Sequence, residues 1–475
     1  MIADLKPYPE YKESGVPRLA QVPERWDTRR LRHVCEIRVS GVDKHTRDGE
    51  TPVRLCNYLD VYKNERIRAS MPFMSASASE DERIRFGLRK WDVVITKDSE
   101  GWNDIGVPSL VESEAPDLIC GYHLAILRAR PILQGPYLHR ALQSRPIAAQ
   151  FYIEATGVTR YGLTRQAIKG ATIPLPPPAE QAAIVRFLDW ANGRLDRAIR
   201  TKRKVIALLN EQKQAIIHRA VTRGLDPSVP LKPSGVPWLG EIPHHWTLRR
   251  FKFLATVNSG HIDPRRAEYR HLVLIAPNHI QSGSGRLLAQ ETADEQGADS
   301  GKYFVRGGQV IYSKIRPNLG KATIAPCDCL CSADMYPITP KTRDLSAEYL
   351  LLLLLSQPFT KFAVDTSMRV AMPKVNREAL ANCLMWYPSR QEQAEILGFI
   401  AREGEPLATA ISRLEREIEL LREYRTRLVS DVATGKLDVR EAAARLPVEV
   451  APDVADDAAG TGDETDSADE EAALA

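Results

Sequence analysis

Two long stretches of the chain place apolar residues at helical intervals. From residue 179 to about residue 222 there is no proline, and apolar side chains recur at the spacing of an amphipathic helix. From residue 400 to 432 leucine or isoleucine recurs every seven residues, with a second apolar position between them. This alternating spacing of four and three residues is typical of a coiled coil. The pattern predicts two long helices, each of about 40 residues or roughly 60 Å.

Each predicted helix needs a partner for its apolar stripe, and the other helix carries one at matching positions. We therefore predict that the two helices form a coiled coil. Two unrelated amphipathic helices, each packed on its own domain, are the alternative. The predicted seam consists of leucine and isoleucine side chains, namely Leu195, Ile199, Ile206, Leu209, Ile216, Leu407, Ile411, Leu414, Ile418, Leu421 and Leu428.

The stretches before the two helices have a different pattern. Short β-branched runs, such as residues 91–96 and 124–127, are bounded by clusters of Gly, Pro, Ser and Asp, which is typical of strands. Four prolines between Pro174 and Pro178 then predict a stiff hinge that ends whatever precedes them. The pattern therefore predicts two mixed α/β domains, each followed by a long helix.

The chain also repeats itself on the scale of a domain. The segment from Ser14 to Arg30 recurs from Ser234 to Arg250, and Gln181 recurs as Gln393 in a second pair of matching segments. A doubled unit of this size indicates two similar domains and a pseudo-two-fold molecule, since solenoids and propellers repeat over 20–50 residues. The predicted division is 1–176 for the first α/β domain, 177–226 for the first long helix, 227–388 for the second domain, 389–440 for the second long helix and 441–475 for an acidic tail.

Composition places the chain among ordinary globular proteins, with 43% hydrophobic and 27% charged residues in 475. The longest apolar run, 350–355, is too short to cross a bilayer, and the first residues lack the features of a secretory signal. We expect a cytoplasmic protein without a membrane partner.

The net charge of +4 hides a separation of charge along the chain. Ten of the 61 acidic residues lie in 447–475, where there is no basic residue, so the rest carries 65 basic against 51 acidic residues, a net +14. A basic body fits a polyanion such as DNA. The acidic tail has too little apolar surface to fold and is expected to be disordered.

No constellation of residues predicts catalysis or metal binding. The chain has no phosphate-binding Gly-rich loop, no Gly-x-Ser-x-Gly elbow and no His-Glu-x-x-His motif. Its seven cysteines predict reduced thiols, and Cys327, Cys329 and Cys331 fit one face of a strand better than a zinc site. We therefore predict no catalytic residue and no metal ligand.

Polar and basic residues do follow the predicted strands, where loops leave a sheet. Arg can bind guanine edges, Asn can pair with adenine, and Lys or Ser can hold phosphate. Any one of them could instead be a solvated loop residue. The candidate DNA contacts are Lys97, Ser99, Asn103, Thr159, Arg160 and Tyr161 in the first domain, and Lys314, Arg316, Asn318, Arg369 and Lys374 in the second.

These features together resemble the specificity subunit of a Type I restriction-modification system. The resemblance rests on Ser-Gly-Val-Pro-x-Leu before Trp26 and Trp246, on Pro-Leu-Pro-Pro-Pro-Ala-Glu-Gln at 174–181, and on the helix ends at 222–226 and 434–438. It covers residues 5 to 440 and omits the acidic tail. It implies an α/β (α+β) fold in which two target-recognition domains are joined by two long helices that form an antiparallel coiled coil.

The resemblance also implies a function without catalysis by this chain. Each domain of such a subunit recognises one half of a split sequence in double-stranded DNA, and the helices bind two modification subunits, with restriction subunits outside. S-adenosylmethionine, ATP and Mg would belong to those partner chains, and this chain would bind no cofactor. The alternatives are a DNA-modifying enzyme with an unrecognised site and a two-armed scaffold that holds proteins and never contacts DNA.

Overall fold

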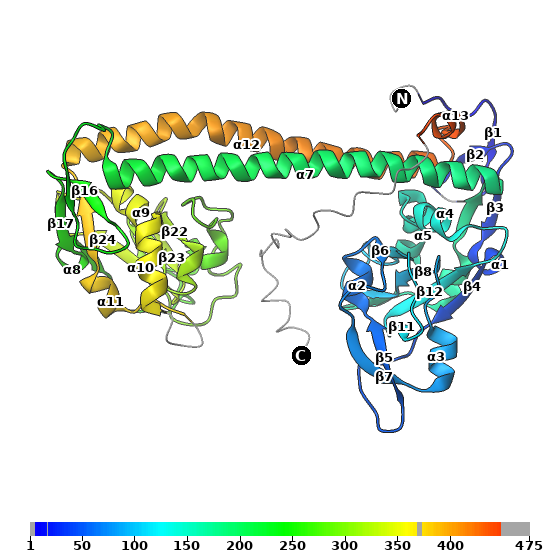
Figure 1. The fold of residues 1–475 in the computed structure, drawn as a ribbon. Coiled ribbons are helices and arrows are strands. Elements are labelled where there is room, and N and C mark those ends of the chain that lie inside the picture. Colours follow the sequence, from blue (N-terminus) through cyan, green and yellow to red (C-terminus); the bar gives the residue numbers. More distant parts are fainter. Residues whose placement is uncertain (1–4, 17, 368–372, 448–475) are drawn as a thin grey trace. The chain divides into compact units, whose positions relative to one another are not determined.

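The computed structural model of the chain describes residues 5–16, 18–367 and 373–447, so the predicted acidic tail lies almost wholly outside the described residues. The chain divides into two compact units. Unit 1 comprises Met1–Ile199 and Glu419–Ala475, and unit 2 comprises Arg200–Ile418. Each unit contains one mixed α/β domain and part of both long helices (Figure 1). The expected α/β class is confirmed, whereas the segment boundaries drawn from the sequence stay predictions.

The domain of unit 1 is built on two β-sheets. The larger sheet has the order β4-β12-β8-β10-β6, in which only β6 and β10 are parallel neighbours, and the smaller sheet has the order β11-β5-β7. Every residue of β8, β10 and β11 is buried, and most of their side chains are apolar. In these orders the strands are Cys35–Val39, Leu124–Ala129, Val93–Thr96, Pro108–Val111 and Arg66–Ile67, then Leu118–Cys120, Thr51–Cys56 and Met74–Ala78.

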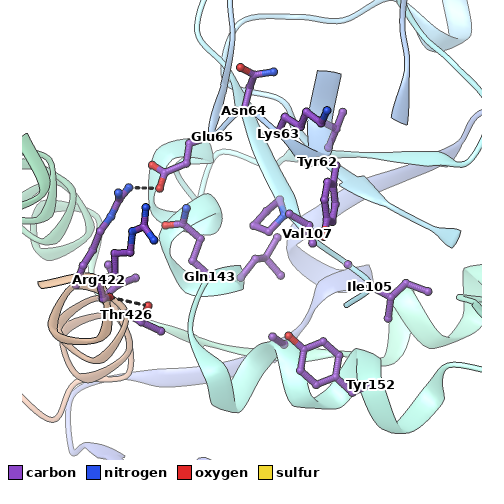
Figure 2. Close-up of a pocket in the computed structure, with 17 residues that line it drawn as sticks. Tyr62, Lys63, Asn64, Glu65, Ile105, Val107, Gln143, Tyr152, Arg422 and Thr426 are labelled. Carbon is purple, nitrogen blue, oxygen red and sulfur yellow. Dashed lines mark hydrogen bonds and ion pairs between the residues drawn. The ribbon is translucent and has the colours of Figure 1, made fainter. Parts of the chain in front are cut away.

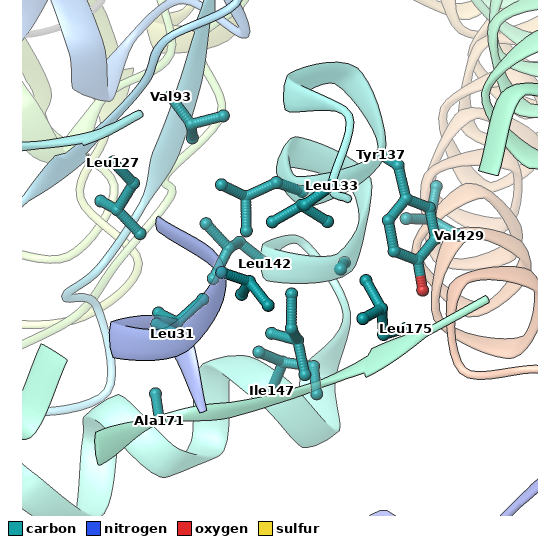
Figure 3. Packing of buried hydrophobic residues seen from close by; sticks show 14 of the residues in the cluster. Leu31, Val93, Leu127, Leu133, Tyr137, Leu142, Ile147, Ala171, Leu175 and Val429 are labelled. Carbon is teal, nitrogen blue, oxygen red and sulfur yellow. The ribbon is translucent and has the colours of Figure 1, made fainter. Parts of the chain in front are cut away.

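The helices α1 (Leu31–Val34), α2 (Tyr58–Tyr62), α3 (Glu80–Phe86), α4 (Gly135–Leu142), α5 (Arg145–Glu154) and α6 (Arg165–Gly170) pack on this domain. Figure 3 shows side chains of α4 between the sheet on one side and Val429 of the second long helix on the other. The hydrophobic core of unit 1 is therefore continuous from the domain into the long helix.

The domain of unit 2 has a similar pair of sheets, but its larger sheet has four strands, and the third strand of its smaller sheet, β20, pairs with β23, whereas β7 pairs with β5 in unit 1. Its larger sheet has the order β18-β24-β21-β22 and its smaller sheet the order β19-β23-β20. The smaller sheet contains one parallel pair in each unit, β5–β11 and β19–β23. The strands are Ala255–Val257, Met335–Pro340, Val310–Ser313 and Ala322–Ile324, then Leu274–Ile275, Cys329–Cys331 and Tyr303–Val305, and the helices that follow are α9 (Ala347–Leu355), α10 (Gln357–Ser367) and α11 (Arg377–Asn382). The duplication of the sequence thus extends to both sheets.

A two-stranded ribbon leads into each long helix. In unit 1 β3 (Asp27–Arg30) pairs with β14 (Thr172–Leu175), and in unit 2 β17 (Thr247–Arg250) pairs with β25 (Leu384–Tyr387). The predicted proline hinge is therefore wrong at Pro174, which lies inside β14. A proline is tolerated there because a strand with one neighbour need not donate from every backbone nitrogen.

The repeated tryptophans, Trp26 and Trp246, follow the hairpins β1–β2 (Tyr11–Glu13 and Gln21–Pro23) and β15–β16 (Leu231–Pro233 and Glu241–Pro243). Both indole rings are fully buried, as expected for anchors of the two cores.

The long helices are α7 (Pro178–Arg223, 46 residues) and α12 (Arg390–Ala433, 44 residues). They pack against each other in both units: Asp196 pairs with Arg425 at 3.0 Å in unit 1, and Lys202 pairs with Glu417 in unit 2. An earlier position on α7 meets a later position on α12, so the helices are antiparallel. Of the predicted seam residues, four are buried (Leu195, Ile199, Ile418 and Leu428) and the other seven are half-buried (Ile206, Leu209, Ile216, Leu407, Ile411, Leu414 and Leu421).

The repeated glutamines join each long helix to its domain. The Gln181 amide oxygen accepts from the backbone nitrogen of Gln134 (2.8 Å), and its amide nitrogen donates to the carbonyls of Pro176 (2.9 Å) and Ile132 (3.1 Å). Gln393 makes the same three bonds with the residues 212 positions later. Both side chains are fully buried, so these bonds fix the first turn of each long helix.

Unit 1 also joins the early and late parts of the chain. The backbone nitrogen of Asp438 donates to the carbonyl of Lys6 (2.8 Å), and the Tyr11 hydroxyl donates to the carbonyl of Gly435 (3.1 Å). Leu428, Val432 and other residues of this late segment lie in the same core as Trp26. The domain of unit 1 is thus completed by the end of α12 and the residues after it.

Candidate nucleic-acid interface

The structure brings together the two predicted clusters of unit 1. After β8, the short strand β9 (Asp98–Ser99) pairs with β13 (Tyr161–Gly162), so that Ser99 lies opposite Tyr161. The backbone of Lys97 connects this pair to the rest of the loop region, because its nitrogen donates to the His123 carbonyl (2.7 Å) and its carbonyl accepts from Leu163 (2.8 Å). Two segments about 60 residues apart in the sequence therefore form one surface.

The candidates of unit 1 differ in their exposure. Asn103, Thr159 and Arg160 are exposed and Tyr161 is half-buried. Ser99 is buried, and its hydroxyl accepts from the backbone nitrogen of Gly101 (3.2 Å). Asn103, Thr159 and Arg160 are thus the side chains best placed to reach a ligand.

Lys97 is half-buried and already has a partner. Its ammonium group lies 2.8 Å from Asp98, which also lies 2.5 Å from His123. Burial raises the pKa of Asp98, but the hydrogen bonds from Lys97 and His123 outweigh it and keep that pKa below its usual value. Lys97 therefore contributes to a neutralised cluster and is not a free cation.

His123 belongs to this surface but was missed from the sequence. Its backbone has a φ of +66°, which is uncommon for a residue other than glycine, and its ring lies against Tyr122 with 3.9 Å between centroids. Both residues line a pocket of about 440 Å³ together with Tyr58 and Phe73. Strained backbone is common at functional sites. No local pattern around a single histidine distinguishes it, so only the fold could identify it.

In unit 2 the predicted loops also meet. Ile315 forms an isolated β-bridge with Lys374, and the backbone nitrogen of Arg316 donates to the Pro373 carbonyl (3.1 Å). Arg316, Asn318 and Lys374 are exposed, and Asn318 lies in the short 3₁₀ helix η2 (Pro317–Leu319). The surface corresponds to that of unit 1, but its exposed side chains are different. Arg369 lies outside the described residues.

Lys314 is half-buried, like Lys97, but has different partners. Its ammonium group donates to the Ala333 carbonyl (2.5 Å) and lies over the Tyr336 ring. Arg377 lies over the same ring and donates to the carbonyls of Val257 (3.0 Å) and Asn258 (2.9 Å). These cations are held by carbonyl and ring contacts, whereas Lys97 is held by a carboxylate.

A second pocket of unit 1, also of about 440 Å³, lies where the domain meets α12. Figure 2 shows Arg422 of α12 beside Glu65 and Gln143 of the domain. Arg425 bonds to Glu65, and the guanidinium of Arg140, which is only 3% exposed, donates to Gln143 (2.8 Å). Charged groups therefore join this domain to the helix.

One ion pair between the domain of unit 1 and its long helix has no counterpart in unit 2. Arg140 also pairs with Asp189 of α7 at 2.7 Å. The residues 212 positions later are Leu352 and Ala401. Unit 2 therefore cannot form the equivalent ion pair.

Among the described residues, no group of three His, Cys, Asp or Glu side chains has the arrangement of a metal site. Cys329 and Cys331 are buried in β23, and Cys327 is exposed. Burial raises the pKa of the Cys329 thiol to about 12, so this thiol is protonated at neutral pH.

Within the described part of the chain, no helix is both long and apolar enough to cross a membrane.

The two α/β domains share the order of four strands in the larger sheet and a parallel pair in the smaller sheet, and they define a class of protein with two similar domains that carry different exposed loops. Residues 243–420 match the family model of the Type I restriction modification DNA specificity domain, so this part of the chain carries such a domain. The resemblance expected from the sequence is thereby confirmed.

Individual relatives agree with this family. The chain is 31% identical over 266 residues to the Type I restriction enzyme EcoDI specificity subunit of Escherichia coli, covering 53% of this chain and 58% of that protein. It is 21% identical over 455 residues to the MjaVIII specificity subunit of Methanocaldococcus jannaschii, covering 90% and 97%. The chain spans little more than half the length of the EcoDI subunit and of the putative MjaX specificity subunit from the same archaeon.

A solved structure has the same fold. A chain from a study of complex assembly and conformational transition of the type I R-M system aligns with 88% of this chain and 99% of its own length. The TM-score is 0.60 at 16% sequence identity, a likeness that concerns the fold alone.

Proposed function

We propose that this chain is the non-catalytic specificity subunit of a Type I restriction-modification complex and binds a bipartite, asymmetric sequence in double-stranded DNA. One observation carries the proposal: two copies of one scaffold present different side chains at equivalent loops. In unit 1 the loops pair at Ser99 and Tyr161, and in unit 2 at Ile315 and Lys374. A shared scaffold with different loops fits one task performed on two different half-sites.

The exposed residues of these loops are suited to base edges and phosphates. In unit 1 the guanidinium of Arg160 can donate to guanine, and Asn103 can pair with adenine. In unit 2 arginine and asparagine stand at other positions of the loops, as Arg316 and Asn318, and Lys374 offers a phosphate contact. Lys97, Ser99 and Lys314 are better suited to positioning these loops because they are already hydrogen-bonded within the chain.

The long helices would hold the partner subunits. The proposal assigns two modification subunits to the surface of α7 and α12, with restriction subunits joining outside them. Adenine methylation from S-adenosylmethionine, and cleavage that needs ATP and Mg, belong to those partners in this scheme. The antiparallel packing of α7 and α12 supports a platform that offers similar surfaces to two copies of one partner.

The test is to map methylated adenines in the host genome with this chain, without it, and with residues 91–165 replaced by those of another specificity subunit. We expect methylation of one bipartite sequence to depend on the chain, and the replacement to change only one half-site. The matched control replaces residues 310–376 and should change only the other half-site. A change of both halves by either replacement, or methylation that does not depend on the chain, contradicts the proposal.

A further inference from the structure

Unit 1 contains a pocket of about 500 Å³ on the far edge of its larger sheet, at strand β4. We call it the basic pocket. It is lined by six cationic side chains and one carboxylate, that of Glu36. The cations come from α1, β4, α3 (Glu80–Phe86), the residue directly after β12, and α6. They are Arg32, Arg38, Arg85, Arg130, Arg165 and Lys169.

Two of these cations form ion pairs with described residues. Arg38 pairs with Glu36 at 2.7 Å, and Arg85 pairs with Asp81 at 2.9 Å. The hydrogen bond from Arg38 lowers the pKa of Glu36, so this carboxylate is ionised and its charge is used by Arg38. Within the described part of the chain, no carboxylate forms an ion pair with the remaining four cations. Four uncompensated positive charges around one pocket attract an anion.

The geometry of Arg165 is fixed by the fold. Its guanidinium donates to the carbonyl of Ile37 on β4 at 3.3 Å. Arg377 is the equivalent residue of unit 2, and it donates to the carbonyl of Val257 at 3.0 Å. Because Val257 corresponds to Ile37 in the repeat, both arginines are held at the same place on the edge strand.

Two more of these cations recur in unit 2. Arg32 of α1 corresponds to Lys252 of α8 (Phe251–Leu254), and Arg130, directly after β12, corresponds to Lys341, directly after β24. The Lys341 ammonium group donates to the Lys252 carbonyl (3.0 Å), which brings the two lysines together. Lys252, Lys341 and Arg377 form no ion pair with any described residue, although other cations of unit 2 do. The positive charge is therefore repeated, although the residue types are not.

The loops that pair at Ser99 and Tyr161 in unit 1, and at Ile315 and Lys374 in unit 2, are the recognition loops. The repeated charge contrasts with these loops, whose exposed side chains differ between the units. A surface that differs between the units suits two different half-sites, whereas a charge that recurs suits a ligand that is the same on both sides. In DNA that common ligand is the phosphate backbone, which carries no sequence information directly.

We propose that the basic pocket of unit 1, and the corresponding cations Lys252, Lys341 and Arg377 of unit 2, bind phosphate groups of the DNA backbone independently of sequence. The inference rests on the proposed function. It adds to that function a pair of phosphate-binding sites outside the recognition loops, and it assigns them to affinity and not to specificity.

The test uses the full chain in complex with its modification subunits, and measures binding to a duplex with the methylated sequence and to an unrelated duplex over a range of KCl concentrations. One variant neutralises the pocket with Arg32→Gln, Arg130→Gln and Lys169→Gln, and a second carries Lys252→Gln and Lys341→Gln. The matched control is Arg145→Gln, which removes an exposed charge of α5 that does not line the pocket. These side chains are at least partly exposed, and glutamine keeps much of their length.

We expect each variant to weaken DNA binding. For a given variant, the loss of affinity should be the same factor for the methylated sequence and for the unrelated duplex. The slope of log affinity against log salt should fall by about one for each phosphate contact removed. The ratio between the two duplexes should not change.

Three results would overturn the proposal. Slopes equal to those of the wild type and of Arg145→Gln would mean that the pocket does not bind DNA. A change in the ratio between the duplexes would mean that it contacts bases. Tighter DNA binding by the variants would indicate that the acidic segment 447–475 occupies the pocket in place of DNA. If the wild-type complex does not prefer the methylated sequence, the proposed function fails, but the slopes still decide whether the pocket binds phosphate.

Discussion

Units 1 and 2 have the same fold but satisfy the polar groups of their cores with different donors. In unit 1 the Tyr137 hydroxyl donates to the carbonyl of Ala433 at the end of α12 (3.3 Å). In unit 2 the equivalent carbonyl, that of Val221 at the end of α7, accepts instead from the Trp386 indole (2.6 Å). Tyr349, the counterpart of Tyr137, is left with no hydrogen-bond partner for its buried hydroxyl in the part of the chain that the structure describes.

A second acceptor shows the same exchange, because its donor is again a tyrosine in unit 1 and a tryptophan in unit 2. The Trp246 indole of unit 2 donates to Glu392 (2.9 Å). In unit 1 the equivalent carboxylate, Glu180, bonds to the Tyr8 hydroxyl, and the Trp26 indole has no partner among the described residues. The two copies thus preserve the acceptors at the helix ends and exchange the donors. The residues at the helix ends have therefore diverged less between the two units than the aromatic residues that bond to them.

The junction between domain and helices differs in chemistry as well as in partners. His139 and Arg140 of unit 1 lie in α4, where they are almost fully buried, and the residues 212 positions later are Leu351 and Leu352. At these two positions unit 1 therefore has titratable side chains where unit 2 has leucines. The following predictions test how far the two units behave alike.

The largest loss of stability is expected at Gln181 and Gln393, which make the same hydrogen bonds in the two units. Gln181→Ala and Gln393→Ala each remove three hydrogen bonds of a fully buried side chain, and should lower the free energy of unfolding of the affected unit by about 3 kcal/mol, at about 1 kcal/mol per bond. Hydrogen exchange of peptides from each unit, followed by mass spectrometry, measures the two effects separately. The equivalence of the junctions is contradicted if one substitution costs less than half as much as the other.

A smaller, pH-dependent effect should appear only in unit 1. Burial lowers the pKa of His139 well below its usual value, and the charges of Arg140 and Arg66 add to this. Below about pH 6.5 an unfolded histidine binds a proton that the folded one does not, so unit 1 should lose up to about 1.4 kcal/mol of stability for each pH unit. The loss should stop once the pH reaches the lowered pKa of the folded state.

His139→Leu, which installs the residue of unit 2, should remove this pH dependence. Hydrogen exchange measured between pH 7 and pH 5 on wild type and variant isolates the contribution of His139, and peptides of unit 2 serve as the internal control. An unchanged pH dependence in the variant would show that this histidine is not the titrating group.

The smallest effect should separate the two equivalent tyrosines. Tyr137→Phe removes a hydroxyl whose one proton is shared between the carbonyls of Pro174 (3.0 Å) and Ala433 (3.3 Å), and should cost unit 1 about 1 kcal/mol. Tyr349→Phe removes a hydroxyl without a partner and should leave unit 2 unchanged or slightly more stable. Equal losses in both units, measured by the same exchange experiment, would mean that the Tyr349 hydroxyl has a partner in solution.

The sequence was sufficient for features that depend on local pattern or on repetition. Apolar spacing located both long helices, and the repeat identified Trp26, Trp246, Gln181 and Gln393 as equivalent positions. The β-branched run at 91–96 contains the observed strand β8. These features could be predicted because helical periodicity and turn residues act over short distances in the chain.

The missing parts depend on contacts between distant segments. The sequence placed both Ser99 and Tyr161 in loops, but their pairing follows from the order of the strands, which no local pattern contains. His123 became a candidate only because its carbonyl accepts from Lys97 and its ring lines a pocket. Pro174 was assigned to a hinge because its role in β14 depends on a partner strand that lies about 145 residues earlier.

The completion of unit 1 by residues after Glu419 has a consequence for the order of folding during synthesis. All of unit 2 has been translated by Ile418, whereas the core of unit 1 still lacks Leu428, Val429 and Val432 at that moment. Because domains fold as units when their residues become available, the domain that leaves the ribosome first waits for the last helical turns of the chain. A chain truncated near residue 418 would therefore contain a complete second domain and a first domain with an open apolar face, which is a form that chaperones bind.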